Sequence, residues 1–347
     1  MADSAPGPLE RAIYALANGE SLSEAHAADV FGVVMRGAAT PAQVGGLLLA
    51  LRVKGENADE VAGAARALRA AMIRVEIEAP FLVDTAGTGG GAVTTFNIST
   101  GAALVAAGAG ATVAKHGNRS YTSRCGSADV LEALGVSVKL DAQGAVRALR
   151  EARVAFLFAP NFHPAMRHVA PVRKELGVTT LMNLLGPLAN PAGVRRQVIG
   201  VADASRGPLV AHALARLGAE HALVVHGLVG MDEVSPAGNT HVWEVRNGAV
   251  REWTIDPARH GLGIDDLRLL AGDEPRRNAD RLERILADGS DAAGRAAVLL
   301  NAGAAIYVAG LASSYEAGVG MAREALDSGA AREALERLRR TGVNSGE

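Results

Sequence analysis

Cysteine, aromatic residues and an excess of charge of either sign are all scarce in this sequence. Its one cysteine, Cys125, excludes an intrachain disulfide and a metal centre built from several cysteines. With no disulfide to form, we expect a reducing, cytoplasmic environment. Lysine and arginine (35) nearly balance aspartate and glutamate (37), and this formal charge of −2 argues against binding to nucleic acid or anionic membranes through the overall field. Any bound anion must therefore be held locally.

Signal-peptide and membrane-span patterns are also missing. The first ten residues contain no basic run followed by an apolar stretch, so we predict no signal peptide. Residues 101–114 are apolar but shorter than the about 20 residues that a bilayer requires, and the apolar segment 296–312 is interrupted by Asn301. Both are mostly alanine, glycine and valine, and we expect them to be tightly packed helices of a soluble protein.

Small and apolar residues are plentiful. The 347 residues, 49% of them hydrophobic, suffice for a large core and suggest two domains, or one domain with a cap. The 41 glycines, against 3% aromatic residues, indicate close contacts between helices and a sheet, with recognition largely by backbone groups.

The first part of the chain shows helical signals only. We predict three helix starts, with Ser21, Thr40 and Asn57 as the capping residues and a Glu or Gln three positions further on in each case. A run of β-branched residues at 73–77 ends the third of these helices, and no segment with strand periodicity precedes it. A small helical domain is expected here.

From Phe81 onward, short apolar runs alternate with stretches of helix length. The runs at 81–83, 111–114, 154–158, 197–201 and 222–225 are apolar on both faces, which is typical of a parallel sheet buried between helices. The segments 241–246 and 249–255 flank Asn247-Gly248, a signal for a type I′ hairpin. The predicted fold class is α/β, with a mostly parallel central sheet flanked by helices in the larger domain.

Two further helices interrupt the sheet pattern. They are predicted at 164–176 and 180–185, closed by Gly186-Pro187, and we expect them to dock on the N-terminal helices. The predicted domains are therefore residues 1–78 with 164–190, a helical domain, and residues 79–163 with 191–347, an α/β domain.

A glycine-rich loop follows the first predicted strand. Gly87, Gly89, Gly90 and Gly91 allow backbone N–H groups to converge on an anion, and hydroxyl and amide side chains then lead into an Ala/Gly helix. The start of a helix favours phosphate through its free N–H groups and its dipole. A flexible connection with a simple helix cap is the alternative, but glycines and hydroxyls on adjoining sides of one turn favour phosphate binding. The loop lacks the Gly-Lys-Ser/Thr of a P-loop.

A basic block, Lys115 to Arg119, follows the second predicted strand, and a Ser/Thr-rich tail follows it. Lys115, Arg119 and Arg124 supply positive charge beside hydroxyl donors, which suits a pyrophosphate. A solvated basic loop is the alternative. Because open α/β sheets bind ligands at the carboxyl ends of their strands, we expect one shared polyanion site.

An acidic pair, Asp232-Glu233, follows the strand predicted at 222–225. Adjacent carboxylates suit a hard cation such as Mg²⁺, with phosphates and waters completing its coordination, although an acidic pair on a loop is often only solvated. No spacing of histidines and carboxylates indicates zinc.

Taken in order, these motifs resemble the anthranilate phosphoribosyltransferase family over nearly the whole chain. The segments 48–60, 87–100, 115–135, 156–164, 171–177, 183–191 and 301–328 are similar to successive family blocks. The resemblance implies a helical domain and an α/β domain with the site between them, a homodimer formed through the helical domain, and Mg²⁺ as the cofactor. It implies transfer of phosphoribose from phosphoribosyl pyrophosphate to the amine of anthranilate, with release of pyrophosphate, in tryptophan biosynthesis.

The resemblance also implies roles for individual residues. Donor-binding residues would be Gly87, Thr88, Gly89, Gly90, Gly91, Thr95, Asn97, Ser99, Thr100, Lys115, His116, Gly117, Asn118, Arg119, Ser120, Tyr121, Thr122, Ser123 and Ser127. Anthranilate would be contacted by Gly87, Asn118, His163 and Arg173, with Arg173 pairing with its carboxylate. Ser99, Asp232 and Glu233 would hold the metal, and His116 is a hypothetical catalytic acceptor for the amine proton. For Arg173 alone, a salt bridge on a helix face is the simpler interpretation.

The chain departs from the family at the glycine loop, where Gly91 replaces the usual aspartate. We expect retained activity with altered Mg²⁺ dependence. Thr122 replaces a frequent serine and keeps the hydroxyl. Alternatives are a paralogue that acts on another aromatic acid, and a non-catalytic relative that binds nucleic acid, against which the net charge and the intact basic block argue. A pyrimidine nucleoside phosphorylase would be longer and would carry a different lysine loop.

Overall fold

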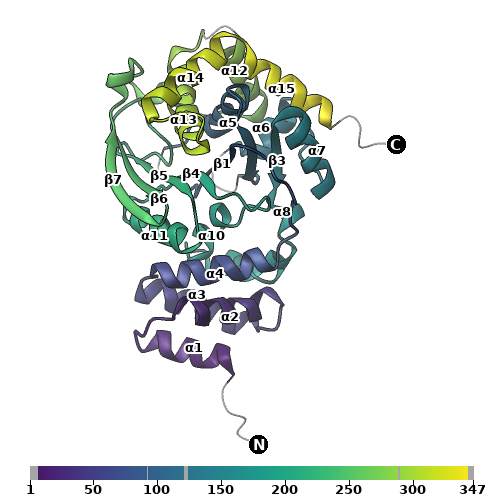
Figure 1. Cartoon of the computed structure of the whole chain (residues 1–347). Helices are drawn as coiled ribbons and strands as arrows, with labels where there is room; N and C mark the ends of the chain where they lie inside the picture. The colour runs from purple at the N-terminus through teal and green to yellow at the C-terminus, as the bar shows by residue number, and fades with distance from the viewer. Residues whose placement is uncertain (1–6, 92, 121–123, 288–289, 343–347) are drawn as a thin grey trace, which may run out of the picture.

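The N-terminal part of the chain is helical, as the sequence predicts, and its described residues form a stack of four helices. In the computed structural model, which describes residues 7–91, 93–120, 124–287 and 290–342, these helices form the narrow lower end of the molecule (Figure 1). They are α1 (Pro8–Ala17), α2 (Glu24–Met35), α3 (Pro41–Lys54) and α4 (Ala58–Ala70). Among the described residues, no strand precedes residue 82.

Two of the three predicted helix caps are confirmed. The side chains of Thr40 and Asn57 accept hydrogen bonds from the backbone N–H groups of Gln43 and Glu60. Gln43 and Glu60 in turn accept from the backbone N–H groups of the two caps, so that both helix starts are complete capping boxes.

The prediction for Ser21 is wrong. Helix α2 begins at Glu24, and Ser23 caps it. The backbone N–H of Leu22 instead donates to the buried carboxylate of Glu60 at 3.0 Å, which ties this connection to α4. A contact between segments 38 residues apart thus sets the helix start, and the local pattern does not contain it.

A seven-stranded sheet forms the centre of the larger body (Figure 1). Its spatial order is β3-β2-β1-β4-β5-β6-β7, parallel from β3 to β5 and antiparallel from β5 to β7. The strands are β1 (Leu82–Gly87), β2 (Thr112–Gly117), β3 (Val154–Phe158), β4 (Arg196–Gly200), β5 (His221–Gly227), β6 (Thr240–Arg246) and β7 (Ala249–Ile255). The hairpin prediction is confirmed, and Asn247 and Gly248 both have the positive φ that a type I′ turn needs.

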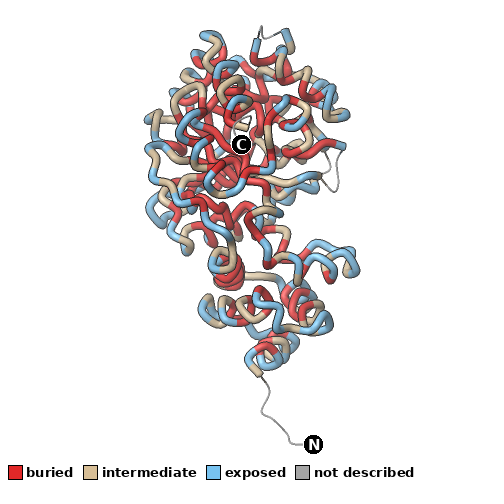
Figure 2. Tube along the Cα trace, turned by 90° about the vertical axis from the view of Figure 1, so that its right-hand side faces the viewer, coloured by how far each residue is buried: buried red, intermediate tan, exposed pale blue. Residues whose placement is uncertain are grey.

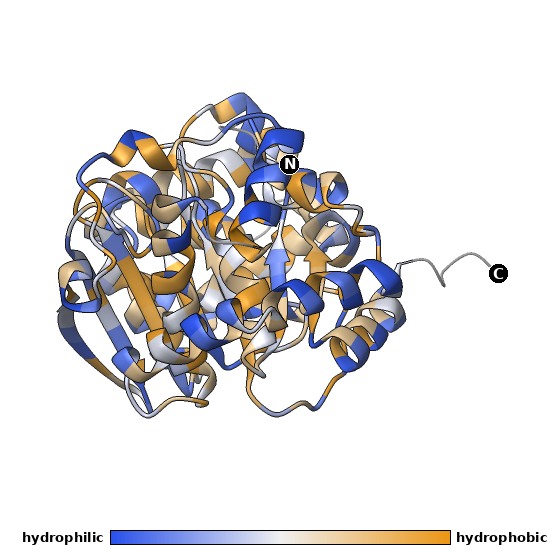
Figure 3. Cartoon of the chain, turned by 90° about the horizontal axis from the view of Figure 1, so that it is seen from above, coloured by the Kyte–Doolittle hydropathy of each residue, from blue (hydrophilic) through white to orange (hydrophobic). Residues whose placement is uncertain are grey.

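Helices cover both faces of the sheet, which explains why apolar and polar residues do not alternate along its parallel strands. In β5, Leu223 and Val225 belong to one core with the helices drawn above the sheet in Figure 1, whereas Ala222 and Val224 belong to a second core below it. The upper layer includes α5 (Ile98–Gly108), α12 (Pro275–Ala287), α13 (Ala292–Ala309), α14 (Tyr315–Asp327) and α15 (Ala330–Thr341), and α6 (Ser127–Ala133) and α7 (Ala142–Ala152) flank it. Below the sheet lies α11 (Gly207–Arg216). Figure 2 shows that buried residues occupy the centre of this larger domain. Figure 3 shows that strands with apolar residues lie inside, with more polar segments around them.

The inserted segment packs against the N-terminal helices, as expected. It follows the short helix α8 (Ala159–Phe162) and contains η1 (Pro164–His168), α9 (Ala170–Leu176) and α10 (Met182–Leu188), which contact α2, α3 and α4 respectively. The predicted end at Gly186-Pro187 is wrong, because α10 continues through Pro187 to Leu188. Because Pro187 has no N–H to donate, the last turn of α10 lacks one backbone hydrogen bond.

Helix α13 is long and apolar enough to cross a bilayer, and it is the one such helix in the described chain. Within its 18 residues, 89% are buried inside the protein, so it is a core helix, as expected.

Strand β1 lies where the topology of the sheet reverses. The chain proceeds from β1 to β2 on one side, whereas β4 lies on the other side. Open α/β sheets bind ligands beyond the carboxyl ends of the strands at such a position.

Candidate active site

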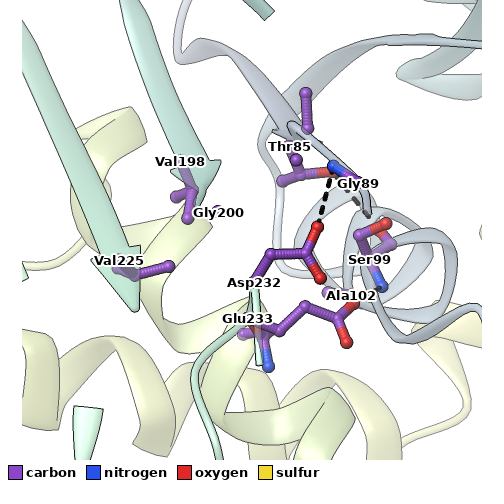
Figure 4. A pocket seen from close by; sticks show the side chains of 12 residues that line it. Thr85, Gly89, Ser99, Ala102, Val198, Gly200, Val225, Asp232 and Glu233 are labelled. Atoms are coloured by element: carbon purple, nitrogen blue, oxygen red, sulfur yellow. Dashed lines mark hydrogen bonds between the residues drawn. The ribbon is translucent and has the colours of Figure 1, made fainter. Parts of the chain in front are cut away.

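A cavity opens at the carboxyl ends of β1 and β4 (Figure 4). Its lining comes from β1, the glycine loop, the start of α5, the ends of β4 and β5, the acidic pair and α13. The residues are Thr85, Ala86, Gly87, Gly89, Ser99, Ala102, Val198, Gly200, Val225, Asp232, Glu233 and Asn301. The structure therefore brings together the glycine loop, the hydroxyl-bearing helix start and the acidic pair, which lie far apart in the sequence.

The two acidic side chains accept hydrogen bonds from the glycine loop and from residues at the start of α5, across the cavity. Asp232 accepts a hydrogen bond from the backbone N–H of Gly89 at 3.0 Å. Glu233 accepts from the backbone N–H of Ser99 at 3.2 Å and from the hydroxyl of Thr95 at 2.9 Å. The glycine loop and the start of α5 are thereby held by carboxylates that Figure 4 shows pointing into the cavity.

The acidic pair is poised for a cation. Burial raises the pKa of Glu233 to about 8, with a further increase from the adjacent Asp232, and burial also raises the pKa of Asp232. Two half-buried carboxylates that disfavour their own ionisation fit a hard divalent cation, and the hydroxyl of Thr95 and the backbone N–H of Ser99 lie beside Glu233. The described residues contain no cluster of three His, Cys, Asp or Glu side chains, so phosphates and waters would have to supply further ligands.

Two glycines allow the acidic loop to lie against the strand ends. A Cβ atom on Gly87 would lie 2.8 Å from Oδ2 of Asp232, and one on Gly200 would lie 1.6 Å from the backbone oxygen of Asp232. In the loop itself, Gly89 and Gly90 adopt positive φ, a conformation that other residues rarely accept. At Gly200, where the close atom belongs to the backbone, glycine is thus a steric requirement of the site.

Lys115 lies beneath the cavity and does not reach solvent. Its ammonium group donates to the backbone oxygen of Thr85 at 2.6 Å and to the hydroxyl of Ser99 at 3.1 Å. Burial lowers the pKa of Lys115 to about 8, opposed by Asp84 and Glu233. The structure thus shows a buried cation supporting Ser99, where the sequence suggested a direct phosphate contact.

Asp84, which the sequence analysis did not single out, replaces part of the β1–β2 ladder. The two strands pair only at residues 82 and 83, after which the carboxylate of Asp84 accepts the backbone N–H of His116 at 3.1 Å. Burial raises the pKa of Asp84 to about 6. No local pattern signals this contact, because it joins residues 32 positions apart.

Asn97 stands at the N-cap position of α5, but its side chain makes no cap hydrogen bond. Its amide oxygen accepts from the thiol of Cys125 at 3.2 Å and from Asn278 at 3.1 Å, and its amide nitrogen donates to the backbone oxygen of Cys125. Thr100 is buried, and its hydroxyl has no partner among the described residues.

The basic block is only partly arranged as the sequence suggests. Arg119 forms ion pairs with Asp129 and Glu132 of α6, the arrangement expected of a structural helix contact. Ser127 is the first residue of α6. The backbone of Ser120 passes so close to the neighbouring Gly126 that a Cβ atom there would lie 2.3 Å from the backbone nitrogen of Ser120. Gly117 is the last residue of β2, and Asn118 and Ser120 lie between β2 and α6. These three residues and Thr88 of the glycine loop are outside the cavity lining. Tyr121, Thr122 and Ser123 lie outside the described residues.

Three of the residues predicted on the acceptor side, His116, His163 and Arg173, lie toward the inserted segment. His116, at the end of β2, and His163, after α8, face each other with 3.2 Å between their Nε2 atoms. Arg173 lies on α9, which packs against α3. None of these three lines the cavity around Asp232.

Comparison with known proteins identifies the class. Residues 79–332 match the family model described as "Glycosyl transferase family, a/b domain". Residues 10–72 match the model of the helical bundle domain of the glycosyl transferase family. The fold and the site thus define a two-part glycosyl transferase.

Relatives narrow this class further. The chain is 51% identical to the anthranilate phosphoribosyltransferase of Anaeromyxobacter dehalogenans over 95% of its own length and 97% of the relative. It superposes on the Thermus thermophilus enzyme of that name with a TM-score of 0.90 and 44% identity, covering 95% and 98% of the two chains. A Saccharomyces cerevisiae enzyme of the same name, solved with PRPP and Mg, gives 0.85 and 30%, covering 96% and 97%. The chain belongs to the anthranilate phosphoribosyltransferase family.

Proposed function

We propose that this protein transfers the 5-phosphoribosyl group of phosphoribosyl pyrophosphate to the amine of anthranilate. The products are N-(5-phosphoribosyl)anthranilate and pyrophosphate, and the reaction is a step of tryptophan biosynthesis. The observation that carries this proposal is the acidic pair, which faces the glycine loop and the start of α5 across one cavity at the switch point of the sheet. Family membership over 95% of the chain supports it.

The donor would lie across the glycine loop and the start of α5. The glycine loop and the hydroxyl groups at the start of α5 are suited to phosphate oxygens, whereas the N–H groups of Gly89 and Ser99 donate to Asp232 and Glu233. Thr88, Asn97, Thr100 and the 115–127 segment complete the proposed donor site. Lys115 would act from below, by fixing Ser99 and by its positive charge. These groups stabilise the charge that develops on the departing pyrophosphate.

Mg²⁺ is the proposed cofactor, held by Asp232, Glu233 and Ser99. When bound, it would neutralise charge on the leaving pyrophosphate. The chain's own residues have separate tasks: the acidic pair orients the glycine loop, and the start of α5 orients the donor for attack at its anomeric carbon.

Anthranilate would approach from the side of the inserted segment. Gly87, Asn118 and His163 are the proposed contacts, and Arg173 is the proposed partner of its carboxylate. An aromatic amine is unprotonated near neutral pH, so attack does not require a strong base. His116 as proton acceptor stays a hypothesis.

We propose the domain division 1–78 with 164–190 and 79–163 with 191–347, a homodimer formed through the helical part, and a cytoplasmic location. Tyr14 on α1 and Val53 on α3 are 73% and 86% exposed, and such a dimer would cover apolar side chains of this kind. Light scattering on the wild type and on Val53→Glu tests this: a monomeric wild type contradicts it.

The decisive experiment follows the loss of anthranilate fluorescence in the presence of enzyme, phosphoribosyl pyrophosphate and Mg²⁺. Loss that requires all components confirms donor, acceptor and metal together. Asp232→Asn and Glu233→Gln should each reduce turnover at least about 100-fold, since each removes one charge from the cation site. Donor binding by calorimetry without fluorescence loss would show that the acceptor is another aromatic acid.

A further inference from the structure

Asn301 is a buried polar residue in an otherwise apolar segment. It lies in the middle of α13, is 6% exposed, and every other residue from 296 to 306 is apolar. An amide buried in this way destabilises a protein unless its hydrogen bonds are made. Its presence in a core helix therefore needs an explanation beyond packing, and it also lines the cavity.

Among the residues that the structure describes, the side chain of Asn301 forms its hydrogen bonds with backbone groups. Its amide oxygen accepts from the N–H of Val234 at 2.9 Å, and its amide nitrogen donates to the oxygen of Val234 at 2.8 Å and to that of Ala297 at 2.9 Å. The side chain thus grips both polar groups of one residue that lies 67 positions away. The amide oxygen accepts one hydrogen bond and the amide nitrogen donates two, which fixes the amide group in one orientation.

Val234 directly follows the acidic pair, so its hydrogen bonds with Asn301 help to set the position of Asp232 and Glu233 in the cavity. On one side, Gly200 of β4 lets the backbone of Asp232 come so close that a Cβ would lie 1.6 Å from its oxygen. On the other side, Asn301 holds the peptide groups that follow Glu233. The N-terminal side of the loop is closed by reciprocal hydrogen bonds between Gly227 and Met231, at 2.9 and 3.1 Å.

We propose that Asn301 is a positioning residue for the divalent-cation site: by holding Val234 it aims the carboxylates of Asp232 and Glu233 into the cavity. The inference rests on the proposed function for the identity of the ligands. This role requires no contact of Asn301 with the donor or the acceptor. It acts through the loop backbone, as groups behind metal ligands commonly do.

The test compares Asn301→Leu, which keeps the size but removes the hydrogen bonds, with Val308→Ala, which opens a small gap in the same buried helix two turns away. Mn²⁺ binding is measured by electron paramagnetic resonance with phosphoribosyl pyrophosphate present, after subtraction of an enzyme-free titration. Asn301→Leu should weaken Mn²⁺ binding about 10-fold or more, the loss typical of groups behind metal ligands, and Val308→Ala should leave it unchanged. If Asn301→Leu does not fold, Asn301→Ser replaces it.

A second readout separates positioning from general damage. In steady-state turnover, Asn301→Leu should raise the Mg²⁺ concentration for half-maximal rate about 10-fold, while the KM for anthranilate stays within about 2-fold of the wild-type value. Equal Mn²⁺ affinity of Asn301→Leu and wild type overturns the proposal. A wild type that consumes no anthranilate overturns the proposed function instead, and the Mn²⁺ comparison still decides the role of Asn301.

Discussion

The imidazole rings of His116 and His163 form a hydrogen-bonded pair with 3.2 Å between their Nε2 atoms. Nδ1 of His116 lies 3.1 Å from the backbone oxygen of Gly186, which can only accept, so a neutral His116 carries its proton on Nδ1. Its Nε2 then accepts, and His163 must donate from Nε2. This leaves Nδ1 of His163 without a proton.

The pair should make stability depend on pH. Burial lowers the pKa of His116 to about 3 and that of His163 to about 4, whereas a histidine in the unfolded chain titrates near 6.5. Below pH about 6.5 the unfolded chain therefore binds more protons, so the free energy of unfolding falls as the pH falls toward 4. In His163→Gln this loss should be smaller by about 3 kcal/mol at pH 4. Urea denaturation between pH 4 and 8 measures it.

The exposed His212→Gln serves as the control for that series, and its unfolding free energy should follow the wild-type curve. Parallel curves for wild type and His163→Gln would show that the buried pair contributes nothing to the pH dependence.

The same pair yields a kinetic prediction. Loss of a general base usually lowers the rate 10²–10⁴-fold, but the acceptor nitrogen of His116 is already occupied by His163. We therefore expect His116→Ala to lower kcat less than about 10-fold at saturating substrates. Its unfolding free energy should fall by about 1–3 kcal/mol, because a buried donor of His163 loses its partner. A loss of kcat above 100-fold, measured by anthranilate fluorescence, would support His116 as the proton acceptor.

Local patterns predicted the elements but not the contacts that join them. The capping boxes at Thr40 and Asn57 and the turn at Asn247-Gly248 depend on neighbours within four residues, and all three are confirmed. The helix cap predicted at Ser21 is wrong because Glu60, 39 residues away, accepts a hydrogen bond from the adjacent backbone N–H of Leu22. The strand positions followed from apolar runs, since a strand covered on both faces must be apolar throughout.

The same limit applies to the site. The glycine loop and the acidic pair could be found because each is a contiguous motif, and strand-end geometry brings them together. Asp84, Gly200 and Asn301 act through partners far along the chain, and no sequence motif around Asp84 or Gly200 indicates a role. The polar interruption of an apolar helix by Asn301 was the one available signal, because burial of an amide is costly.

Gly200 should be intolerant of even a methyl group. Because a Cβ there would lie 1.6 Å from the backbone oxygen of Asp232, Gly200→Ala must displace the acidic loop. We expect Gly200→Ala to lose about 1–3 kcal/mol of unfolding free energy, as overpacking typically costs, and to need more Mg²⁺ for half-maximal turnover. Thermal unfolding and an Mg²⁺ titration measure the two effects.

Gly320→Ala is the matched control for this substitution. Gly320 lies in α14 without positive φ and with no atom within 4 Å of its added Cβ. This variant should be more stable than wild type by about 0.5–1 kcal/mol, with an unchanged Mg²⁺ titration. If Gly200→Ala and Gly320→Ala have the same stability and the same Mg²⁺ titration, the close approach of Gly200 to Asp232 does not affect Mg²⁺ use.

Gly91 provides a test of charge alone. A Cβ on Gly91 would lie 3.3 Å from the backbone oxygen of Gly230 and 3.9 Å from Oδ1 of Asp232, so an aspartate fits with a small shift and brings its carboxylate beside the acidic pair. An added charge about 4 Å from a bound cation contributes at least about 1 kcal/mol, which corresponds to about 5-fold in affinity. Gly91→Asp should therefore lower the half-saturating Mg²⁺ concentration by about that factor, and Gly91→Asn, of the same shape without the charge, should not. Superimposable Mg²⁺ titrations for wild type, Gly91→Asp and Gly91→Asn would show that the site has no need of a third carboxylate at this position.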